Sequence, residues 1–178
     1  LREEGYREIV ITGIEISSYG RDLAGDVGLI DLLEAISPVA GEMRIRLGSL
    51  EPRTITEEFC RRAVKLPNLC PQFHLSLQSG CDETLKRMNR KYDTAAYLEK
   101  IAKLREAVPD VSITSDIIVG FPGETEDQFR ELLDFVEKKK KGGHGCLMET
   151  AMTLALRPDL VDMSRVSAVD GTSTGYLS

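Results

Sequence analysis

Polar side chains and glycines follow four short apolar runs of the sequence, and these are the residues whose types could bind a polar ligand. They occupy residues 12–15, 48–53, 76–80 and 116–124. Hydroxyl, amide and carboxylate groups offer hydrogen bonds to a ribose, an amine or the edge of a base, and glycine lets backbone amides approach a ligand closely. One such loop is typical of ordinary turn chemistry, whereas four in succession favour a polar-ligand site.

The apolar runs are predicted β-strands that would bring these loops to one edge of a sheet. They cover residues 8–12, 43–47, 72–77 and 111–119, with helical patterns between them. Strands that alternate with helices form parallel βαβ units with right-handed crossovers, and ligands bind at the carboxyl ends of such strands. The spacing fits both an open doubly wound sheet and an arc of a barrel, and it does not choose between them.

Capping signals and apolar faces mark the predicted helices. Residues 54–57 and 125–128 have the pattern of capping boxes, and Asp93 is predicted to be an N-cap. The apolar faces consist of Leu29, Leu32, Leu33 and Ile36, of Tyr97, Ile101 and Leu104, and of Phe129, Leu132, Leu133 and Val136. The regular pattern ends near Lys141. We therefore predict one domain over residues 1–141 and an appended irregular or helical segment over 142–178, with a helix candidate at 147–156.

Composition and charge narrow the classes of protein to consider. The 178 residues are 42% hydrophobic and 29% charged, and the net charge is −6, which argues against nonspecific nucleic-acid binding. No run of about 18 uncharged apolar residues and no signal-like segment is present, so we expect a cytoplasmic protein without membrane contact. The basic runs at residues 86–91 and 138–141 are interpreted as solvated helix faces.

The four cysteines lack the spacing of a metal site. Cys60, Cys70, Cys81 and Cys146 stand far apart, and no pair has the two-residue gap of zinc or iron–sulfur ligation. We expect all four to be reduced and structural, including Cys81, which follows a polar strand end.

Three ordered blocks of the sequence carry a family resemblance. Residues 46–52 (RLGSLEP), 74–90 (HLSLQSGCDETLKRMNR) and 116–124 (DIIVGFPGE) resemble the blocks of radical S-adenosylmethionine (SAM) methylthiotransferases. The resemblance covers about residues 1–141 and implies a partial, incomplete parallel (β/α) barrel of the radical SAM type. Residues 11–14 (ITGI) fit best the branch that modifies threonylcarbamoyladenosine in tRNA. The branches acting on isopentenyladenosine in tRNA or on a ribosomal protein stay open.

The resemblance also implies cofactors, a partner and roles for the strand-end residues. SAM and 4Fe–4S clusters are the cofactors of the family, and tRNA is the partner of the full-length enzyme. Thr12, Gly13 and Glu15 would lie near the methionine amino group, Ser49, Gln78 and Asp116 would face the cofactor, and Ile118 and Gly120 would lie near the adenine. Asp116 has a second interpretation, in which it fixes the loop to the next helix.

The family holds its radical cluster in a CxxxCxxC loop, and the cysteines of this sequence do not form one. In the family, SAM binds the fourth iron of that cluster and is cleaved reductively. We therefore expect this chain alone to be inactive in methylthiolation. The leading hypothesis is a fragment of a radical SAM tRNA methylthiotransferase.

The last part of the sequence carries a different resemblance. Residues 142–161 are similar to a segment of creatininase-like metal-dependent amidohydrolases, and His144 and Glu149 match its active-site His and Glu. One His and one Glu at this spacing are also common as surface or capping residues. A chimeric sequence would explain both resemblances.

Two alternatives to a methylthiotransferase fragment follow from these observations. The first is a cluster-free or engineered α/β scaffold or nucleoside-binding module. The second is a metal-dependent amidohydrolase that uses His144 and Glu149. Because a partial barrel exposes strand edges, we also expect self-association or coverage of an edge by the C-terminal segment.

Overall fold

The structure is a computed structural model of the chain, and it describes residues 1–108 and 110–139. Leu1–Val136 forms one compact unit. The predicted segment 142–178 lies outside the described residues. It includes the helix candidate at 147–156 and the residues His144, Cys146 and Glu149. The domain boundary at residue 141 therefore stays a prediction. Among the described residues, no helix combines the length and the apolar character that crossing a bilayer requires.

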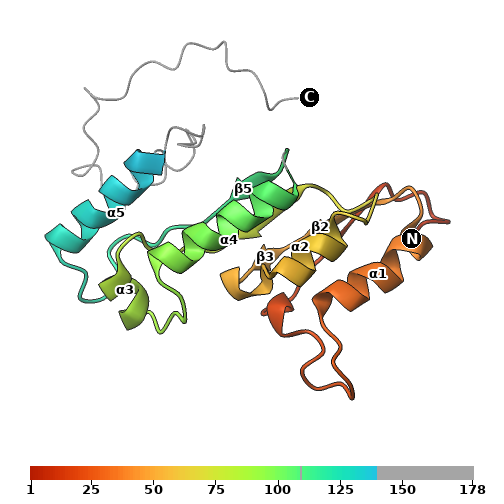
Figure 1. Cartoon of the computed structure of the whole chain (residues 1–178), viewed down its shortest axis with the longest axis horizontal. Coiled ribbons are helices and arrows are strands. Elements are labelled where there is room, and N and C mark those ends of the chain that lie inside the picture. The colour runs from red at the N-terminus through yellow and green to blue at the C-terminus, as the bar shows by residue number, and fades with distance from the viewer. Residues whose placement is uncertain (109, 140–178) are drawn as a thin grey trace, which may run out of the picture. The chain divides into compact units, whose positions relative to one another are not determined.

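Parallel strands form the centre of this unit (Figure 1). They are β1 (Glu8–Ile11), β2 (Arg44–Leu47), β3 (Ser49–Leu50), β4 (Gln72–Leu75) and β5 (Ser112–Thr114). β1 pairs with β2, and β3, β4 and β5 pair in that order, with every pair parallel. β3 continues β2 after Gly48, and a bridge between Ile45 and Leu69 joins β2 to the approach of β4.

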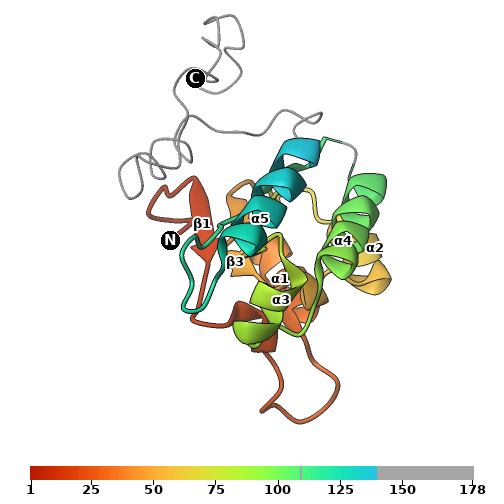
Figure 2. The same cartoon turned by 90° about the vertical axis from the view of Figure 1, so that its left-hand side faces the viewer.

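Helices follow the strands along the chain, and the last described helix comes after the last strand. They are α1 (Leu29–Ala40), α2 (Glu57–Ala63), α3 (Asp82–Arg87), α4 (Thr94–Ala107) and α5 (Glu126–Lys139), with 3₁₀ turns η1 (Ile16–Ser18) and η2 (Pro52–Thr54). α1, α2 and α4 lie side by side and pack against the same face of the strands (Figures 1 and 2). A doubly wound sheet has helices on both faces, so this arrangement favours the barrel arc.

The predicted parallel α/β architecture is therefore confirmed, and the strands do not close into a barrel within the described residues. β1 pairs only with β2 in this part of the chain, which leaves its other side as a sheet edge. Self-association through such an edge stays a prediction.

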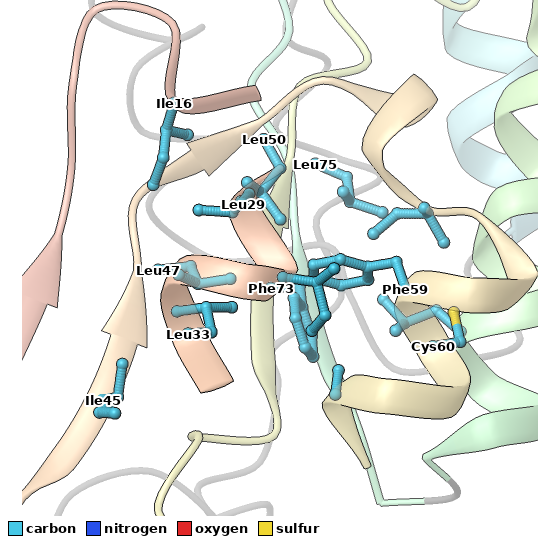
Figure 3. Packing of buried hydrophobic residues seen from close by; sticks show 14 of the residues in the cluster. Ile16, Leu29, Leu33, Ile45, Leu47, Leu50, Phe59, Cys60, Phe73 and Leu75 are labelled. Atoms are coloured by element: carbon cyan, nitrogen blue, oxygen red, sulfur yellow. The ribbon is translucent and has the colours of Figure 1, made fainter. Parts of the chain in front are cut away.

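The hydrophobic core lies between the strands and the helices α1, α2 and α4 (Figure 3). Phe73 of β4 is 1% exposed, and its ring meets that of Phe59 from α2 edge-to-face at 6.3 Å. Leu33 of α1 and Leu47 of β2 are buried in the same cluster. Full burial of each such side chain stabilises the fold by roughly 1.5–3 kcal/mol, so this cluster is what holds the strands to the helices.

The strands alternate apolar and polar side chains, which gives the sheet a second, polar face. Side chains of a strand point to opposite faces in turn. Ile45 and Leu47 of β2 are buried, whereas Arg44 and Arg46, which alternate with them, are not. We call the face opposite the helices the inner face; it carries Glu8, Arg44, Arg46, Gln72, His74 and Thr114.

Two of the three predicted helix caps are confirmed. The Asp93 carboxylate accepts a hydrogen bond from the Ala96 amide at 2.7 Å. Thr125 and Gln128 form a reciprocal capping box at the start of α5, with each side chain accepting from the other's backbone amide.

The predicted capping box at residues 54–57 is wrong. Pro52 opens the turn η2, which takes up Thr54, so α2 begins two residues later with Thr56 as its N-cap. The Thr56 hydroxyl accepts from the Phe59 amide at 3.0 Å. Thr54 and Thr56 are equally suited as helix caps. Pro52, whose ring fixes its φ, starts the turn that includes Thr54, so Thr56 becomes the N-cap.

The strand predicted over residues 111–119 is shorter than expected. β5 ends at Thr114 because the Ser115 hydroxyl accepts the Leu77 amide at 2.8 Å, where a ladder bond between backbones would otherwise form. The pairing resumes once, between Gln78 and Ile117. The strand ends are therefore held by side chains as well as by the ladder.

Candidate functional site

The carboxyl ends of the strands lie next to one another, as parallel pairing requires. Ile11 at the end of β1 is opposite Leu47 of β2, and Leu50 at the end of β3 is opposite Leu75 of β4. The loops that carry the predicted site residues therefore start from one edge of the sheet. This edge is the candidate site.

Gln78, Asp116 and Ile118 are brought together by backbone hydrogen bonds. The Gln78 amide donates to the Asp116 carbonyl at 2.9 Å, and the Ile118 amide donates to the Gln78 carbonyl at 2.8 Å. Gln78 has a φ of 72°, in the left-handed region that an L-residue other than Asn, Asp or Gly adopts at a cost of roughly 1–3 kcal/mol. Strained backbone of this kind persists only where the surrounding structure holds it in place, and it is concentrated at functional sites.

Thr12 lies against Gly48, beside Ser49. A Cβ at Gly48 would stand 2.8 Å from the Thr12 hydroxyl oxygen and 3.2 Å from its Cβ. The Gly48 amide donates to the Ile11 carbonyl at 2.9 Å, so the missing side chain allows the ends of β1 and β2 to approach. Thr12 and Ser49 are both exposed at this junction.

Glu15 is held by arginines on the surface of the site. Its carboxylate pairs with Arg53 of η2 and lies 3.9 Å from Arg21. Arg53 also contacts Glu51 at 2.6 Å. Exposed pairs of this kind are worth roughly 0–1 kcal/mol each, so they orient Glu15 more than they stabilise the fold. The exposed Gly13 has the Ile16 amide nitrogen, 3.9 Å from an added Cβ, as its nearest neighbour.

Gly120 and Ile118 lie on the exposed part of the loop after β5. Gly120 has a φ of 73° and its amide donates to the Glu124 carboxylate at 2.6 Å. Ile118 is 40% exposed. This loop therefore presents an apolar side chain beside a turn that glycine makes possible.

The Asp116 carboxylate faces His74 of β4. Its Oδ2 lies 3.2 Å from His74 Nε2, and the Asp116 side chain is 72% exposed. α5, the next helix, begins with its own cap at Thr125. The contact of Asp116 in this structure is thus with the inner face of the sheet.

A row of polar side chains crosses the inner face, and the sequence analysis missed it. We call Glu8, Arg46, Gln72, Thr114 and His74 the polar row. Arg46 binds both carboxylate oxygens of Glu8, at 2.9 and 3.2 Å, and this hydrogen-bonded guanidinium lowers the pKa of Glu8. The signal that could have found the row is the period of two in EIVI, RIRL, QFHL and SIT, which puts these polar residues on one face.

Two tyrosines support the end of β4 from the helix side. The Tyr97 hydroxyl donates to the Leu75 carbonyl at 3.0 Å, and the Tyr92 hydroxyl donates to the carbonyls of Ser76 and Leu77 at 2.8 and 3.2 Å. Burial raises the pKa of Tyr92 to about 12 and also raises the pKa of Tyr97. Both phenols therefore stay protonated donors that fix the carbonyls just before Gln78.

Three cysteines lie in the described part of the chain, and the Cys81 amide donates to the Ser79 hydroxyl at 3.2 Å. Cys60, Cys70 and Cys81 are buried free thiols, and desolvation raises the pKa of Cys60. Within residues 1–108 and 110–139, no group of three or more His, Cys, Asp or Glu side chains is arranged to hold a metal ion.

The family model of the radical SAM superfamily matches residues 1–136. The chain therefore belongs to the radical SAM superfamily. This match covers the strands, the helices as far as Val136 of α5, and every strand-end residue of the candidate site.

Curated relatives are methylthiotransferases that modify tRNA. The chain is 46% identical over 135 residues to the threonylcarbamoyladenosine tRNA methylthiotransferase MtaB of Thermotoga maritima, which covers 76% of this chain and 31% of that protein. It is 43% identical over 138 residues to a tRNA-2-methylthio-N(6)-dimethylallyladenosine synthase of Clostridium botulinum, covering 78% of this chain and 31% of the relative. The chain thus spans about a third of the length of these proteins.

A solved structure supports the fold. The cobalamin-dependent S-adenosylmethionine radical enzyme OxsB superposes with a TM-score of 0.53 at 16% identity, over 74% of this chain and 19% of that one. At this identity the likeness concerns the fold alone, and it agrees with the barrel arc described above.

Proposed function

We propose that residues 1–136 form part of the SAM-binding wall of a radical SAM tRNA methylthiotransferase. The observation that carries the proposal is the pairing of Gln78 with Asp116 at the strand ends, in a chain homologous to such enzymes over this segment. The strained backbone of Gln78 and the exposed carboxylate of Asp116 support a ligand-binding role.

The chemistry of the strand-end residues suits SAM. The Asp116 carboxylate accepts hydrogen bonds from hydroxyl or ammonium groups, and the Gln78 side chain both donates and accepts. Ile118 is an exposed apolar surface for a base. On this proposal Thr12, Gly13 and Glu15 lie at the methionine end, Ser49, Gln78 and Asp116 along the ligand, and Ile118 and Gly120 at the adenine.

The 4Fe–4S cluster of the family supplies the reductive cleavage of SAM. Cys60, Cys70 and Cys81 are buried and belong to no metal-holding group of side chains in the described part of the chain, so we propose that they do not ligate it. Anaerobic reconstitution of the chain with iron and sulfide, followed by metal analysis, tests this. We expect no stoichiometric four-iron cluster, and recovery of one that is lost when all three cysteines are replaced by serine would refute the proposal that they do not ligate it.

The names of the relatives support a proposal for the substrate of the whole enzyme. We propose tRNA bearing a modified adenosine, with threonylcarbamoyladenosine favoured because the relative with 46% identity is named for it. Methylthiolation assays of the full-length protein with tRNA of either modification state decide between the two substrates. Equal activity on a dimethylallyladenosine-bearing tRNA would sink the preference.

Calorimetry with SAM tests the binding site on this chain. Wild type should bind at about 1 mM ligand, which corresponds to roughly 4 kcal/mol of binding free energy. Asp116→Asn should bind about tenfold more weakly, because a charge-assisted hydrogen bond to the ligand is worth roughly 1.5–3 kcal/mol. Asp110→Asn is the matched control, since Asp110 is an exposed aspartate at the opposite end of β5.

Three results would count against this site. They are the absence of binding by wild type, equal weakening by the two aspartate variants, and equally tight binding of adenosine. The last would favour the nucleoside-binding module, in which the methionine end contributes nothing.

A further inference from the structure

The polar row has a direction, which the chemistry of its donors and acceptors fixes. Arginine has only donors, so the Gln72 oxygen must face Arg46, and Arg46 Nη1 donates to Gln72 Oε1 at 2.9 Å. The amide nitrogen of Gln72 then faces β5, where it donates to Thr114 Oγ1 at 3.3 Å. Thr114 therefore accepts a hydrogen bond from Gln72 and retains its own hydroxyl hydrogen to donate.

His74 lies within reach of that hydrogen. Its Nδ1 lies 3.0 Å from Thr114 Oγ1. A neutral imidazole has one acceptor nitrogen and one N–H, so a ring that accepts at Nδ1 carries its hydrogen on Nε2. A row in which Thr114 donates to Nδ1 thus favours the Nε2–H tautomer of His74.

The hydrogen on Nε2 points into the candidate site. His74 Nε2 is enclosed and forms no hydrogen bond in the described part of the chain, while Asp116 Oδ2 stands 3.2 Å away. The Asp116 side chain is 72% exposed, so most of its surface is open to solvent and to a ligand. A hydrogen bond from Nε2–H to Oδ2 requires a rotation of this carboxylate.

We propose that His74, as the Nε2–H tautomer, positions the Asp116 carboxylate for its ligand. His74 holds one carboxylate oxygen, and the other accepts from a hydroxyl or ammonium group of the bound molecule. The identity of that molecule as SAM rests on the function proposed above, whereas the tautomer and the contact with Asp116 rest on the polar row alone. His74 acts through Asp116 and does not itself touch the ligand.

Nitrogen-15 NMR of histidine-labelled chain tests the tautomer without any ligand. The chain has two histidines, and the His144→Gln variant assigns the remaining signals to His74. At about pH 8 we expect an unprotonated Nδ1 and a protonated Nε2. Thr114→Val should mix the tautomers, because it removes the hydroxyl that donates to Nδ1.

The same spectra report the contact with Asp116. Asp116→Asn should shift the Nε2 signal, and Asp110→Asn should leave it in place. A ring hydrogen found on Nδ1, or an Nε2 signal that does not respond to Asp116→Asn, would overturn the proposal. These measurements need only the folded wild type and surface substitutions, so loss of folding in a His74 variant does not affect them.

Two replacements of His74 separate positioning from bulk. The amide nitrogen of Gln reaches the place of Nε2, whereas that of Asn reaches only the place of Nδ1. We expect His74→Gln to bind SAM within about threefold of wild type and His74→Asn to bind about tenfold more weakly, as Asp116→Asn does. The double variant His74→Asn/Asp116→Asn should bind no more weakly than either single one.

The outcomes keep the two proposals apart. If wild type binds no SAM while the NMR result holds, the proposed function fails and the role of His74 toward Asp116 stands. If SAM binds and the Gln and Asn variants weaken binding equally, or their effects add to that of Asp116→Asn, the positioning role fails while the SAM site stands.

Discussion

The backbone amide of Gln78 donates to the carbonyl of Asp116 at 2.9 Å, and Gln78 does so with a φ of 72°. A side chain that is kept in the left-handed region, where glycine would be easier, indicates selection for the side chain itself. The link also couples the loop after β4 to the loop after β5. Substitution of Gln78 or Asp116 should therefore change the conformation of the other residue.

Gln78→Gly should raise stability while it weakens ligand binding. The left-handed conformation costs an L-residue roughly 1–2 kcal/mol, and the flexibility of glycine in the unfolded chain offsets part of this gain. We expect the free energy of unfolding in urea to increase by up to about 1 kcal/mol, with SAM affinity reduced. Gln78→Ala keeps the strain and loses the side chain, so it should not be stabilised. Equal losses of stability in both variants would argue against strain at Gln78.

Gly80→Ala should destabilise the chain by roughly 1–3 kcal/mol, because the added methyl group would collide with Phe135 of α5. A Cβ at Gly80 would stand 2.8 Å from Phe135 Cβ and 3.0 Å from its Cγ. Gly13→Ala is the control, since the nearest atom there is 3.9 Å away. Thermal unfolding of both variants measures the difference, and an equal change in Tm would contradict the packing of α5 against this loop.

Loss of the ion pairs between Arg62 of α2 and two carboxylates of α1 should lower the stability of the chain in acid. Arg62 contacts Asp31 at 2.5 Å and Glu34 at 2.7 Å, and its hydrogen bonds lower the pKa of both carboxyls below their ordinary values of 3.8 and 4.5. Because the pKa values of Asp31 and Glu34 are lowered in the folded protein, these carboxylates contribute fully to stability above their ordinary pKa values. That contribution is lost as the pH falls through the lowered pKa values.

Arg62→Met removes this contribution and keeps much of the side chain's packing. Urea unfolding followed through the acid range should therefore show a shallower loss of stability in the variant than in wild type. Curves that run parallel would mean that other carboxylates set the acid limit.

Tyr92 should contribute to a loss of stability in alkali. Its pKa is raised by burial to about 12, above the ordinary value of 10.0. The contribution of the neutral phenol is therefore complete below pH 10 and is lost as pH rises toward 12. Tyr92→Phe should flatten this part of the stability profile and cost about 1 kcal/mol at neutral pH, since two carbonyls lose a donor. The exposed Tyr6→Phe is the control; if it flattened the profile equally, the effect would not belong to Tyr92.

The sequence predicted the repeating units well and the details of their ends less well. Alternating apolar and helical patterns predicted the strands because burial of one face is a property of each strand alone. The cap at residues 54–57 was wrong because Pro52 changed the local path of the chain, and β5 was shortened by a hydroxyl contact from Ser115. Both effects depend on neighbours that a pattern does not include.

The candidate site shows the same division. Gln78 and Asp116 were predicted from strand ends and family blocks, and the structure places them in contact, although their role stays a proposal. The contact of Asp116 with His74 was missed, because it joins β4 to the loop after β5 across the inner face. Such contacts depend on the register in which the strands pair. Neither β4 nor the loop after β5 determines that register by its own sequence.

Amide chemical-shift mapping of the labelled chain on addition of SAM tests the central claim most directly. The account predicts that shifts concentrate at Thr12, Ser49, Gln78, Asp116 and the residues beside them. The opposite end of the strands, where Gly41, Pro67 and Cys70 line a cavity of about 550 Å³, should stay unchanged. Shifts confined to that cavity, or no shifts at saturating SAM, would contradict the assignment of the strand ends as the SAM-binding wall.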